Sequence, residues 1–394
     1  MRKTCEKIHT DAAYRWFLGI PFGQKTPHFK AFSKNYERRF KDNDIFEKIF
    51  INIVEQAIEY GLVDGKELFT DSTHTKANAN KKKFEVTVCE VVRKRRLWLE
   101  EEINEERKLQ GRKEFVYKDK TTTKKIKVNT TDPDSGYYHR DNKENGFMYL
   151  DYRTVDSKAN IIVDCHVTKG NVHDSSPYIG RLEYIKDTYG FNIERVALDS
   201  GFDSLDIKKY LLEENIFGVI GYRRYGTKES RRERRRYQYI NDLNVYMNKA
   251  TGEVLEYNGN INRDGYMLYT NLDKSEKILR HIKADLNDRY YQNRISTVGR
   301  NLYSLRKEKI ERSFADSKQN HGFRYAMYHG LEKNQNYTWL ICAAQNMKNI
   351  ALKMNRYEAN TQNKALCDLF FPKLTNIYEL FKIYTKREPL AFSN

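Results

Sequence analysis

No segment of the 394-residue sequence approaches the roughly 18 consecutive apolar residues that a membrane-spanning helix needs. The N-terminal stretch Met1–Glu6 also lacks the apolar core of a secretory signal peptide. The five cysteines are scattered and form no C-x-x-C pair, which argues against a disulfide framework and against a structural zinc site. We therefore expect a cytoplasmic protein whose cysteines are reduced.

Acidic residues are too few to balance the basic ones. The chain has 71 Lys and Arg against 54 Asp and Glu, a formal net charge of +17. Such an excess favours a polyanionic partner, and nucleic acid is the first candidate. The 29 Tyr and 20 Phe supply a core, and some rings could lie against sugars and bases, although packing is the commoner role of such side chains.

The order of the predicted elements favours an α/β fold with a mixed sheet and helices packed on it. A helix is predicted from about residue 45, where Asn43 or Asp44 can cap it, and Gly61 ends it. Apolar runs predict strands that end at Asp71 and Asp199. Further strands are predicted over 146–152, 160–167 and 216–221, with helices over 175–188 and 204–214.

Two stretches interrupt this alternation. The charge pattern predicts one long charged helix over residues 84–110, and the polar composition predicts loops and turns over 111–145. Farther along, residues 223–236 hold seven Arg and one Lys against two Glu, a net charge of +6. Residues 237–270 then predict short strands. The basic run is either a solvated loop or a surface for phosphates, and its position favours the second reading.

Three acidic residues are candidates for one metal site. Asp71 and Asp199 stand where apolar strands give out, and Glu311 lies on a predicted helix. Strand ends in an open α/β sheet can bring carboxylates together, and hard cations such as Mg²⁺ take oxygen ligands. Each residue alone is more often a turn former, a helix cap or an exposed partner of a lysine. We treat Asp132, Asp134 and Asp174 as such turn and cap residues.

Several motifs together resemble the DDE transposases of bacterial insertion sequences, and most of all the group numbered 1182. The motifs follow one another over nearly the whole chain. They are Tyr14-Arg15-Trp16-Phe17-Leu18-Gly19, Thr70-Asp71-Ser72-Thr73-His74, Thr131-Asp132-Pro133-Asp134, Gly170-Asn171-Val172-His173-Asp174, Leu198-Asp199-Ser200-Gly201-Phe202, Glu311-Arg312-Ser313-Phe314-Ala315-Asp316-Ser317-Lys318 and Gln345-Asn346-Met347-Lys348.

The resemblance implies an RNase-H-like core interrupted by a β-rich insertion. It also implies that Asp71, Asp199 and Glu311 are the catalytic, metal-binding triad. Their cofactor would be two Mg²⁺ ions, with Mn²⁺ as a substitute, and Lys318 would hold a DNA phosphate near the cut. Water would first cleave at the transposon end, and the freed 3′-OH would then attack target DNA.

Other basic residues are candidates for binding DNA. They are Arg306, Arg312, Arg231, Arg232, Arg234, Arg235 and Arg236. Related families place a Tyr and an Arg at fixed spacing before the Glu. Here Tyr303 and Arg306 are present, but Arg306 lies one position farther from Glu311 than in that pattern, and Lys307 fills the expected place. Relatives commonly carry a helical segment before the motif at Tyr14, so we expect an N-terminally shortened copy.

On this basis the chain is expected to have four parts. They are a helical N-terminal segment (1–62), the first part of the catalytic core with a helical and loop insertion at 84–145 (63–222), a basic and β-rich insertion (223–303), and the last part of the core (304–394).

Three functions remain open from the sequence. They are a transposase, a nuclease on the same core that cuts without joining, and an inactive derivative that only binds DNA. For a transposase, the expected partners are the terminal inverted repeats, target DNA and a second copy of the chain. We expect it in the cytoplasm, at the bacterial nucleoid when it is bound to DNA.

Overall fold

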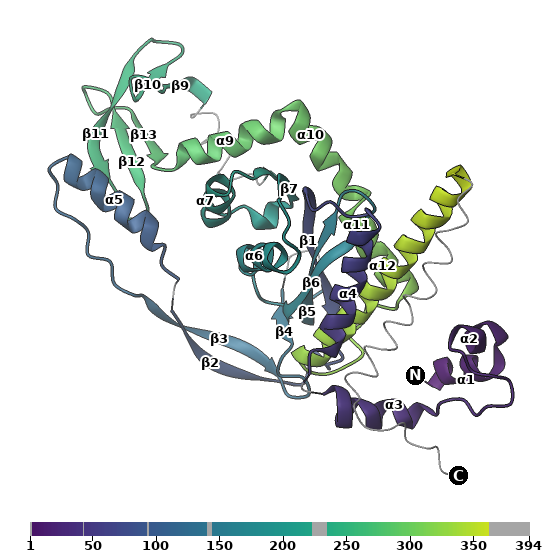
Figure 1. Cartoon of the computed structure of the whole chain (residues 1–394). Helices are drawn as coiled ribbons and strands as arrows, with labels where there is room; N and C mark the ends of the chain where they lie inside the picture. The colour runs from purple at the N-terminus through teal and green to yellow at the C-terminus, as the bar shows by residue number, and fades with distance from the viewer. Residues whose placement is uncertain (1, 42, 93, 140–143, 223–234, 362–394) are drawn as a thin grey trace.

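The centre of the fold is strand β1 (Glu67–Lys76), which lies inside a six-stranded mixed sheet (Figure 1). The computed structural model describes residues 2–41, 43–92, 94–139, 144–222 and 235–361, the last seven by backbone alone. The other strands of this sheet are β4 (Gly136–Tyr138), β5 (Gly146–Asp156), β6 (Ile162–Lys169), β7 (Arg195–Leu198) and β8 (Phe217–Ile220).

The strand order is β4-β5-β1-β7-β8, and β6 also pairs with β5. Strand β5 is antiparallel to β1, β4 and β6, whereas β7 is parallel to β1 and β8 is parallel to β7. Strand β5 is buried along its whole length, and β7 is a short run of Val, Ala and Leu. Such apolar strands are typical of a sheet that is covered on both faces. The α/β fold with a mixed sheet is therefore confirmed.

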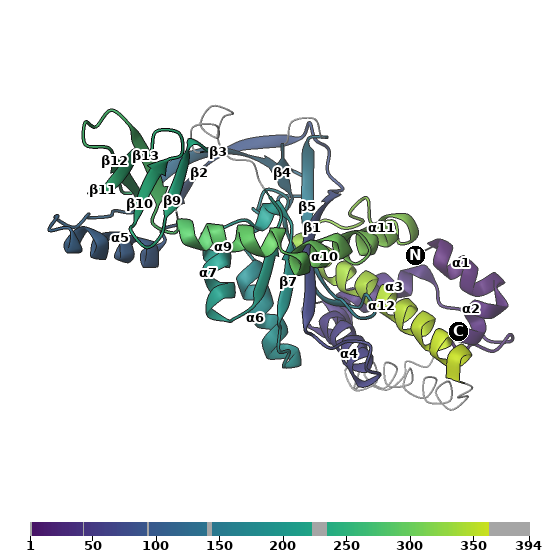
Figure 2. The ribbon, with the colours of Figure 1, turned by 90° about the horizontal axis from the view of Figure 1, so that it is seen from above.

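Helices cover both faces of the sheet (Figures 1 and 2). On one side lie α6 (Tyr178–Tyr189) and α7 (Leu205–Glu213), and on the other α4 (Ile45–Glu59), α11 (Ile310–Asn320) and α12 (Leu331–Thr361). The Asn43 side chain accepts a hydrogen bond from the Ile45 backbone N–H, and Gly61 adopts a left-handed conformation after the helix, as the sequence predicted. No helix in the described residues is long and apolar enough to cross a membrane.

The prediction of one helix over 84–110 is wrong. Strand β2 (Phe84–Val92) pairs antiparallel with β3 (Thr121–Asn129), and only α5 (Leu97–Leu109) is helical. The first half of the segment contains β-branched residues such as Val86 and Val88, which suit a strand once a partner is present. That partner lies in the Lys/Thr-rich stretch for which we expected only loops and turns.

A second sheet lies at one end of the molecule, with α5 packed beside it (Figure 1). Its strands are β9 (Tyr237–Ile240), β10 (Val245–Asn248), β11 (Val254–Ile261), β12 (Tyr266–Thr270) and β13 (Lys277–His281). The strands predicted over 237–270 are thus present, and the sheet extends beyond them. Helices α9 (Ala284–Ile295) and α10 (Thr297–Ser304) then lead the chain back to the first sheet.

The N-terminal helices lie at the opposite end of the molecule (Figure 2). They are α1 (Arg2–Thr10), α2 (Ala12–Phe17) and α3 (Phe29–Asn35), and a π-helical turn (Tyr36–Phe40) follows them. The helical character predicted for this segment is therefore present.

Candidate functional site

Asp71 and Asp199 lie side by side at the point where β1 and β7 cease to pair. Thr70 is opposite Leu198 in the parallel register, and each aspartate is the next residue. Strand β1 does not end there, as the sequence suggested, but continues to Lys76 in its pairing with β5. The side chain of Asp71 is 19% exposed and that of Asp199 is 48% exposed. A buried pair of strands therefore brings two carboxylates to one edge.

Arg306 lies between these two carboxylates. Its Nη2 donates to Asp71 Oδ2 at 2.7 Å, and its Nη1 is 3.7 Å from Asp199 Oδ1. Nη1 also donates to the Tyr303 hydroxyl at 3.2 Å. The Arg306 side chain is only 6% exposed and belongs to the 3₁₀ turn Leu305–Lys307 that follows α10. The two predicted metal ligands thus share one buried cation.

A third carboxylate, that of Asp174, belongs to the same site. Ser72 donates its hydroxyl to Asp174 Oδ1 at 2.7 Å and its backbone N–H to Asp71 Oδ1 at 2.8 Å. Burial raises the pKa of Asp71 to about 6, the Arg306 guanidinium and the Ser72 N–H oppose that rise, and the charges of Asp199 and Asp174 add to it. Asp174 is therefore more than the turn or cap residue that its local sequence predicts, and the motif Gly170–Asp174 is the signal that could have identified it.

The remaining predicted residues, Glu311 and Lys318, lie on helix α11, which packs against β1. Lys318 donates from Nζ to Thr73 Oγ1 at 2.6 Å, two residues beyond Asp71. Glu311 is exposed in the first turn of the helix. Among the residues that the structure describes, no three or more His, Cys, Asp or Glu side chains are grouped so that they could hold a metal ion. The structure therefore brings Asp71 and Asp199 together but does not gather Glu311 with them.

The other predicted DNA contacts are surface residues or lie outside the description. Arg312, Arg235 and Arg236 are exposed. Arg231, Arg232 and Arg234 fall outside the described residues.

The present arrangement does not fit a bound divalent cation, although the chemistry of the donors would suit one. Carboxylate oxygens are the ligands that Mg²⁺ prefers. However, the space between Asp71 and Asp199 holds the Arg306 guanidinium, and Glu311 is exposed elsewhere on α11. Arg306 would have to move away and the Glu311 carboxylate would have to approach before the three carboxylates could share an ion.

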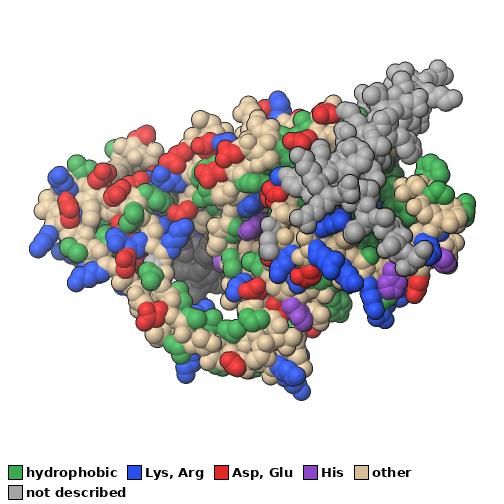
Figure 3. Space-filling model, turned by 60° about the horizontal axis from the view of Figure 1, so that its bottom comes forward, with side chains coloured by type: hydrophobic (Ala, Val, Ile, Leu, Met, Phe, Trp, Pro, Cys, Tyr) green, Lys and Arg blue, Asp and Glu red, His purple; other side chains and the backbone are tan. Residues whose placement is uncertain are grey.

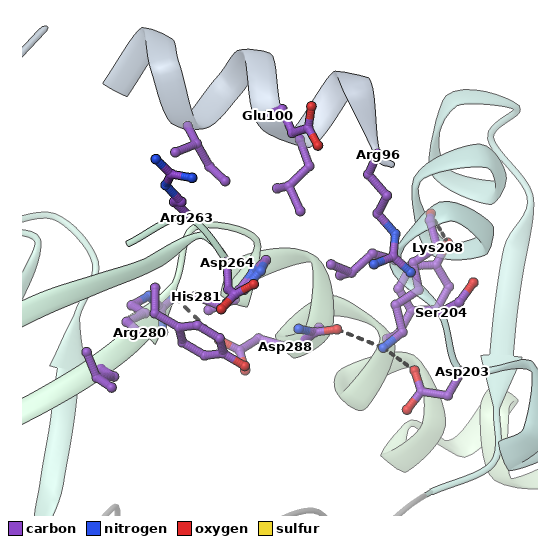
Figure 4. Close-up of a pocket in the computed structure, with 18 of the residues that line it drawn as sticks. Arg96, Glu100, Asp203, Ser204, Lys208, Arg263, Asp264, Arg280, His281 and Asp288 are labelled. Carbon is purple, nitrogen blue, oxygen red and sulfur yellow. Dashed lines mark hydrogen bonds and ion pairs between the residues drawn. The ribbon is translucent and has the colours of Figure 1, made fainter. Parts of the chain in front are cut away.

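A cavity of about 840 Å³ opens beside this site, between the core and the lobe that carries α5 and the second sheet (Figure 4). Nine Lys and Arg, four Asp and Glu, and six Tyr line it, so its wall is basic and rich in rings. In the space-filling view the surface is hollowed between that lobe, at the left, and the main body (Figure 3). The cavity and the acidic site are adjacent, because Gly221 lines the cavity and packs against the backbone of Asp199 and Ser200.

Comparison with known proteins gives one family match, toward the end of the described residues. Residues 271–351, which include Arg306, Glu311 and Lys318, match the model of the transposase DDE domain family. No curated protein matches. The insertion-sequence group numbered 1182 is not identified by these findings and stays a prediction.

Two solved structures of transposases are distantly similar. The piggyBac transposase synaptic complex with hairpin DNA matches at 12% identity and a TM-score of 0.30, over 90% of this chain and 64% of that one. The Mos1 transposase paired-end complex with the left transposon end matches at 9% identity and a TM-score of 0.18, over 58% of this chain and 67% of that one. The chain thus spans less than two thirds of the piggyBac chain that it matches. Residues 271–351 are therefore similar to a DDE-type transposase domain.

Proposed function

We propose that this protein is a transposase that cuts DNA at the ends of a mobile element and joins the freed strands to target DNA. The observation that carries the proposal is the pair Asp71 and Asp199, held at adjacent positions of parallel strands in a chain whose last part matches the DDE domain family. The order of three antiparallel strands followed by two parallel ones supports an RNase-H-like core.

Asp71, Asp199 and Glu311 are the proposed catalytic and metal-binding triad. The proposed cofactor is Mg²⁺, as two ions, with Mn²⁺ as a substitute. Ions of this kind lower the barrier to phosphodiester cleavage by activating the nucleophile and stabilising the leaving oxygen. The residues of this chain have to bind the strand, exclude competing cations and bring Glu311 toward the two aspartates.

Basic residues around the pair are the proposed DNA contacts. Lys318 on α11 contacts Thr73, Arg306 contacts Asp71, and Arg312 follows Glu311 on α11. The exposed Arg235 and Arg236 continue the basic run to which Arg231, Arg232 and Arg234 belong. Each phosphate that such a side chain neutralises adds to the salt dependence of binding.

The proposed partners are the terminal repeats of the element, target DNA and a second copy of the chain that holds the other end. We further propose the four-part division of the chain at residues 62, 222 and 303, with 84–145 as a strand-and-helix insertion instead of the helix and loops first expected. The proposed place of action is the bacterial nucleoid.

The test is the variant Asp199→Asn. Labelled element ends, target DNA and Mg²⁺ are incubated with the wild type and with the variant, and cut and joined products are separated on a gel. We expect the variant to lose both products yet bind DNA as well as the wild type or more tightly, because a charge that repels phosphate is removed. Asp187→Asn, an exposed aspartate on α6, is the control for the loss of one charge.

The same experiment separates the alternatives. Joined products from the wild type support a transposase, cuts without joining support a nuclease, and binding without cutting supports an inactive derivative. Normal cutting by Asp199→Asn would show that the proposed triad is wrong.

A further inference from the structure

The cavity beside the acidic site has two exposed tyrosine rings on its wall, and one arginine contacts both of them. The Arg294 guanidinium lies 4.8 Å from the ring centre of Tyr222 and 5.3 Å from that of Tyr291. Tyr222 is 54% exposed and Tyr291 is 48% exposed. All three residues line the cavity. About half of each ring therefore remains accessible to a flat ligand, which a ring packed in the core could not offer.

The positive charge of the wall is only partly neutralised. Arg95, Lys208 and Arg280 each form an ion pair with a carboxylate. In contrast, Lys118 and Lys120 form no ion pair within the described residues, and both are exposed. The same holds for Lys94 and Arg263, whereas Arg294 is half-buried against the two tyrosines. Exposed lysines that form no ion pair within the described residues are therefore available for a ligand that carries several negative charges.

The volume of the cavity limits the size of the ligand that it can hold. A volume of about 840 Å³ suits a ligand of a few hundred daltons, such as one or two nucleotides, and is too small for a duplex. In a duplex the faces of the bases are stacked on one another, whereas unpaired bases can stack on Tyr and Arg. The exposed lysines of the cavity wall can bind the phosphates that join such bases.

We propose that this cavity binds unpaired nucleotides of DNA next to the phosphodiester that is cut. The bases stack on Tyr222, Arg294 and Tyr291, and the phosphates contact Lys118 and Lys120. Gly221 leads directly from Tyr222 to the backbone of Asp199, so a strand in the cavity would pass the acidic site. The link to cutting rests on the proposed function, whereas binding of the strand does not.

The test compares a fluorescein-labelled thymidine oligonucleotide with a labelled duplex of the same length by fluorescence anisotropy. We expect Tyr222→Ala and Tyr291→Ala each to weaken binding of the single strand about tenfold, because one base loses its stacking partner. Binding of the duplex should change less than about twofold. Tyr14→Ala is the matched control, because that ring is 40% exposed on α2, far from the cavity.

A second measurement uses charge. Lys118→Ala/Lys120→Ala should lower the slope of log affinity against log salt for the single strand by about 1.4, since about 0.7 is lost for each phosphate contact. The proposal is overturned if the double tyrosine variant Tyr222→Ala/Tyr291→Ala binds the single strand within about twofold of the wild type. It is also overturned if this variant weakens duplex binding equally. Failure of the proposed function looks different, because Asp199→Asn would then cut normally while the tyrosine variants still lose single-strand binding.

A separate observation concerns Arg306. Its guanidinium fills the space between Asp71 and Asp199, while its buried Nε has no hydrogen-bond partner. The side chain is therefore held mainly by the two carboxylates and the Tyr303 hydroxyl. We infer that Arg306 is the internal cation of this site and that a divalent cation must compete with it for Asp71 and Asp199.

This inference is tested by metal binding without DNA and without turnover. Mn²⁺ affinity is measured by electron paramagnetic resonance for the wild type, Arg306→Met and Arg306→Lys. We expect Arg306→Met to bind Mn²⁺ at least about tenfold more tightly and Arg306→Lys to stay near the wild type, because lysine keeps the positive charge. Arg300→Met, an exposed arginine on α10, controls for net charge.

Circular dichroism checks that each variant is folded. Equal Mn²⁺ affinity of the wild type and Arg306→Met, or the same gain in Arg300→Met, would overturn the inference.

Discussion

Arg153 holds the sheet to the helix that carries Glu311 and Lys318, and its replacement tests that connection. The side chain is fully buried on β5. Its Nε donates to Asp151 Oδ2 at 2.9 Å, and Nη1 donates to Ser317 Oγ on α11 at 2.7 Å and to Gln345 Oε1 on α12 at 3.1 Å. One guanidinium therefore joins a strand and two helices.

The variant Arg153→Met keeps an unbranched side chain but removes every one of these contacts. The carboxylate of Asp151, only 1% exposed, would remain buried without its cation. Breaking a buried ion pair by removing one partner costs about 3–5 kcal/mol, so we expect the free energy of unfolding to fall by about 4 kcal/mol. Burial already raises the pKa of Asp151 and Arg153 opposes that rise, so the loss should be smaller at acidic pH, where Asp151 can take up a proton.

The assay is urea denaturation, monitored by tryptophan fluorescence, to which Trp339 contributes from its place against the core on α12. The double variant Asp151→Leu/Arg153→Met removes both charges and should recover at least half of the lost free energy, because apolar pairs replace buried ion pairs at little cost. If Arg153→Met lies within about 1 kcal/mol of the wild type, or the double variant is no more stable than the single one, the reasoning fails.

Two further predictions concern stability. The pKa of Asp71 is about 6 in the folded protein and near 3.8 in the unfolded chain, so ionisation of this group costs stability as pH rises from about 4 to 6. In thermal unfolding, the free energy of unfolding of Asp71→Asn relative to that of the wild type should therefore rise by up to about 3 kcal/mol between pH 4 and pH 7. A difference between the two proteins that does not change with pH would contradict this. Tyr149→Phe should lose about 1.5–3 kcal/mol in chemical denaturation, because the hydroxyl donates to both oxygens of buried Asp132 at 2.7 and 2.8 Å. An unchanged free energy of unfolding would mean that the Gly330 N–H, which also donates to Asp132, satisfies the buried carboxylate without the Tyr149 hydroxyl.

The failed prediction at residues 84–110 shows where local sequence patterns mislead. The run of charges predicts a helix, and α5 is one, although it buries Leu99 and Ile103. Strand β2 depends on β3, whose first residue is 29 positions after β2 ends, so its pairing cannot be read from a local window. Asp174 was missed for a similar reason. An aspartate before a helix is a good cap, and only the contact with Ser72 shows that it faces Asp71.

The sequence by itself determined the ingredients of this protein. Its apolar runs predict strands of the first sheet, and an aspartate follows two of those runs. Its charge favours a polyanionic partner. Its last motif belongs to a segment that matches the DDE domain family. These are local properties of composition and spacing.

Only the tertiary structure decided how the ingredients meet. Parallel pairing of β1 with β7 brings Asp71 to Asp199 across 128 residues of chain, and a 3₁₀ turn inserts Arg306 between them. The cavity likewise arises where α5 and the second sheet meet the core. Strand pairing and side-chain packing are long-range interactions, so the register and the buried cation are properties of the folded chain.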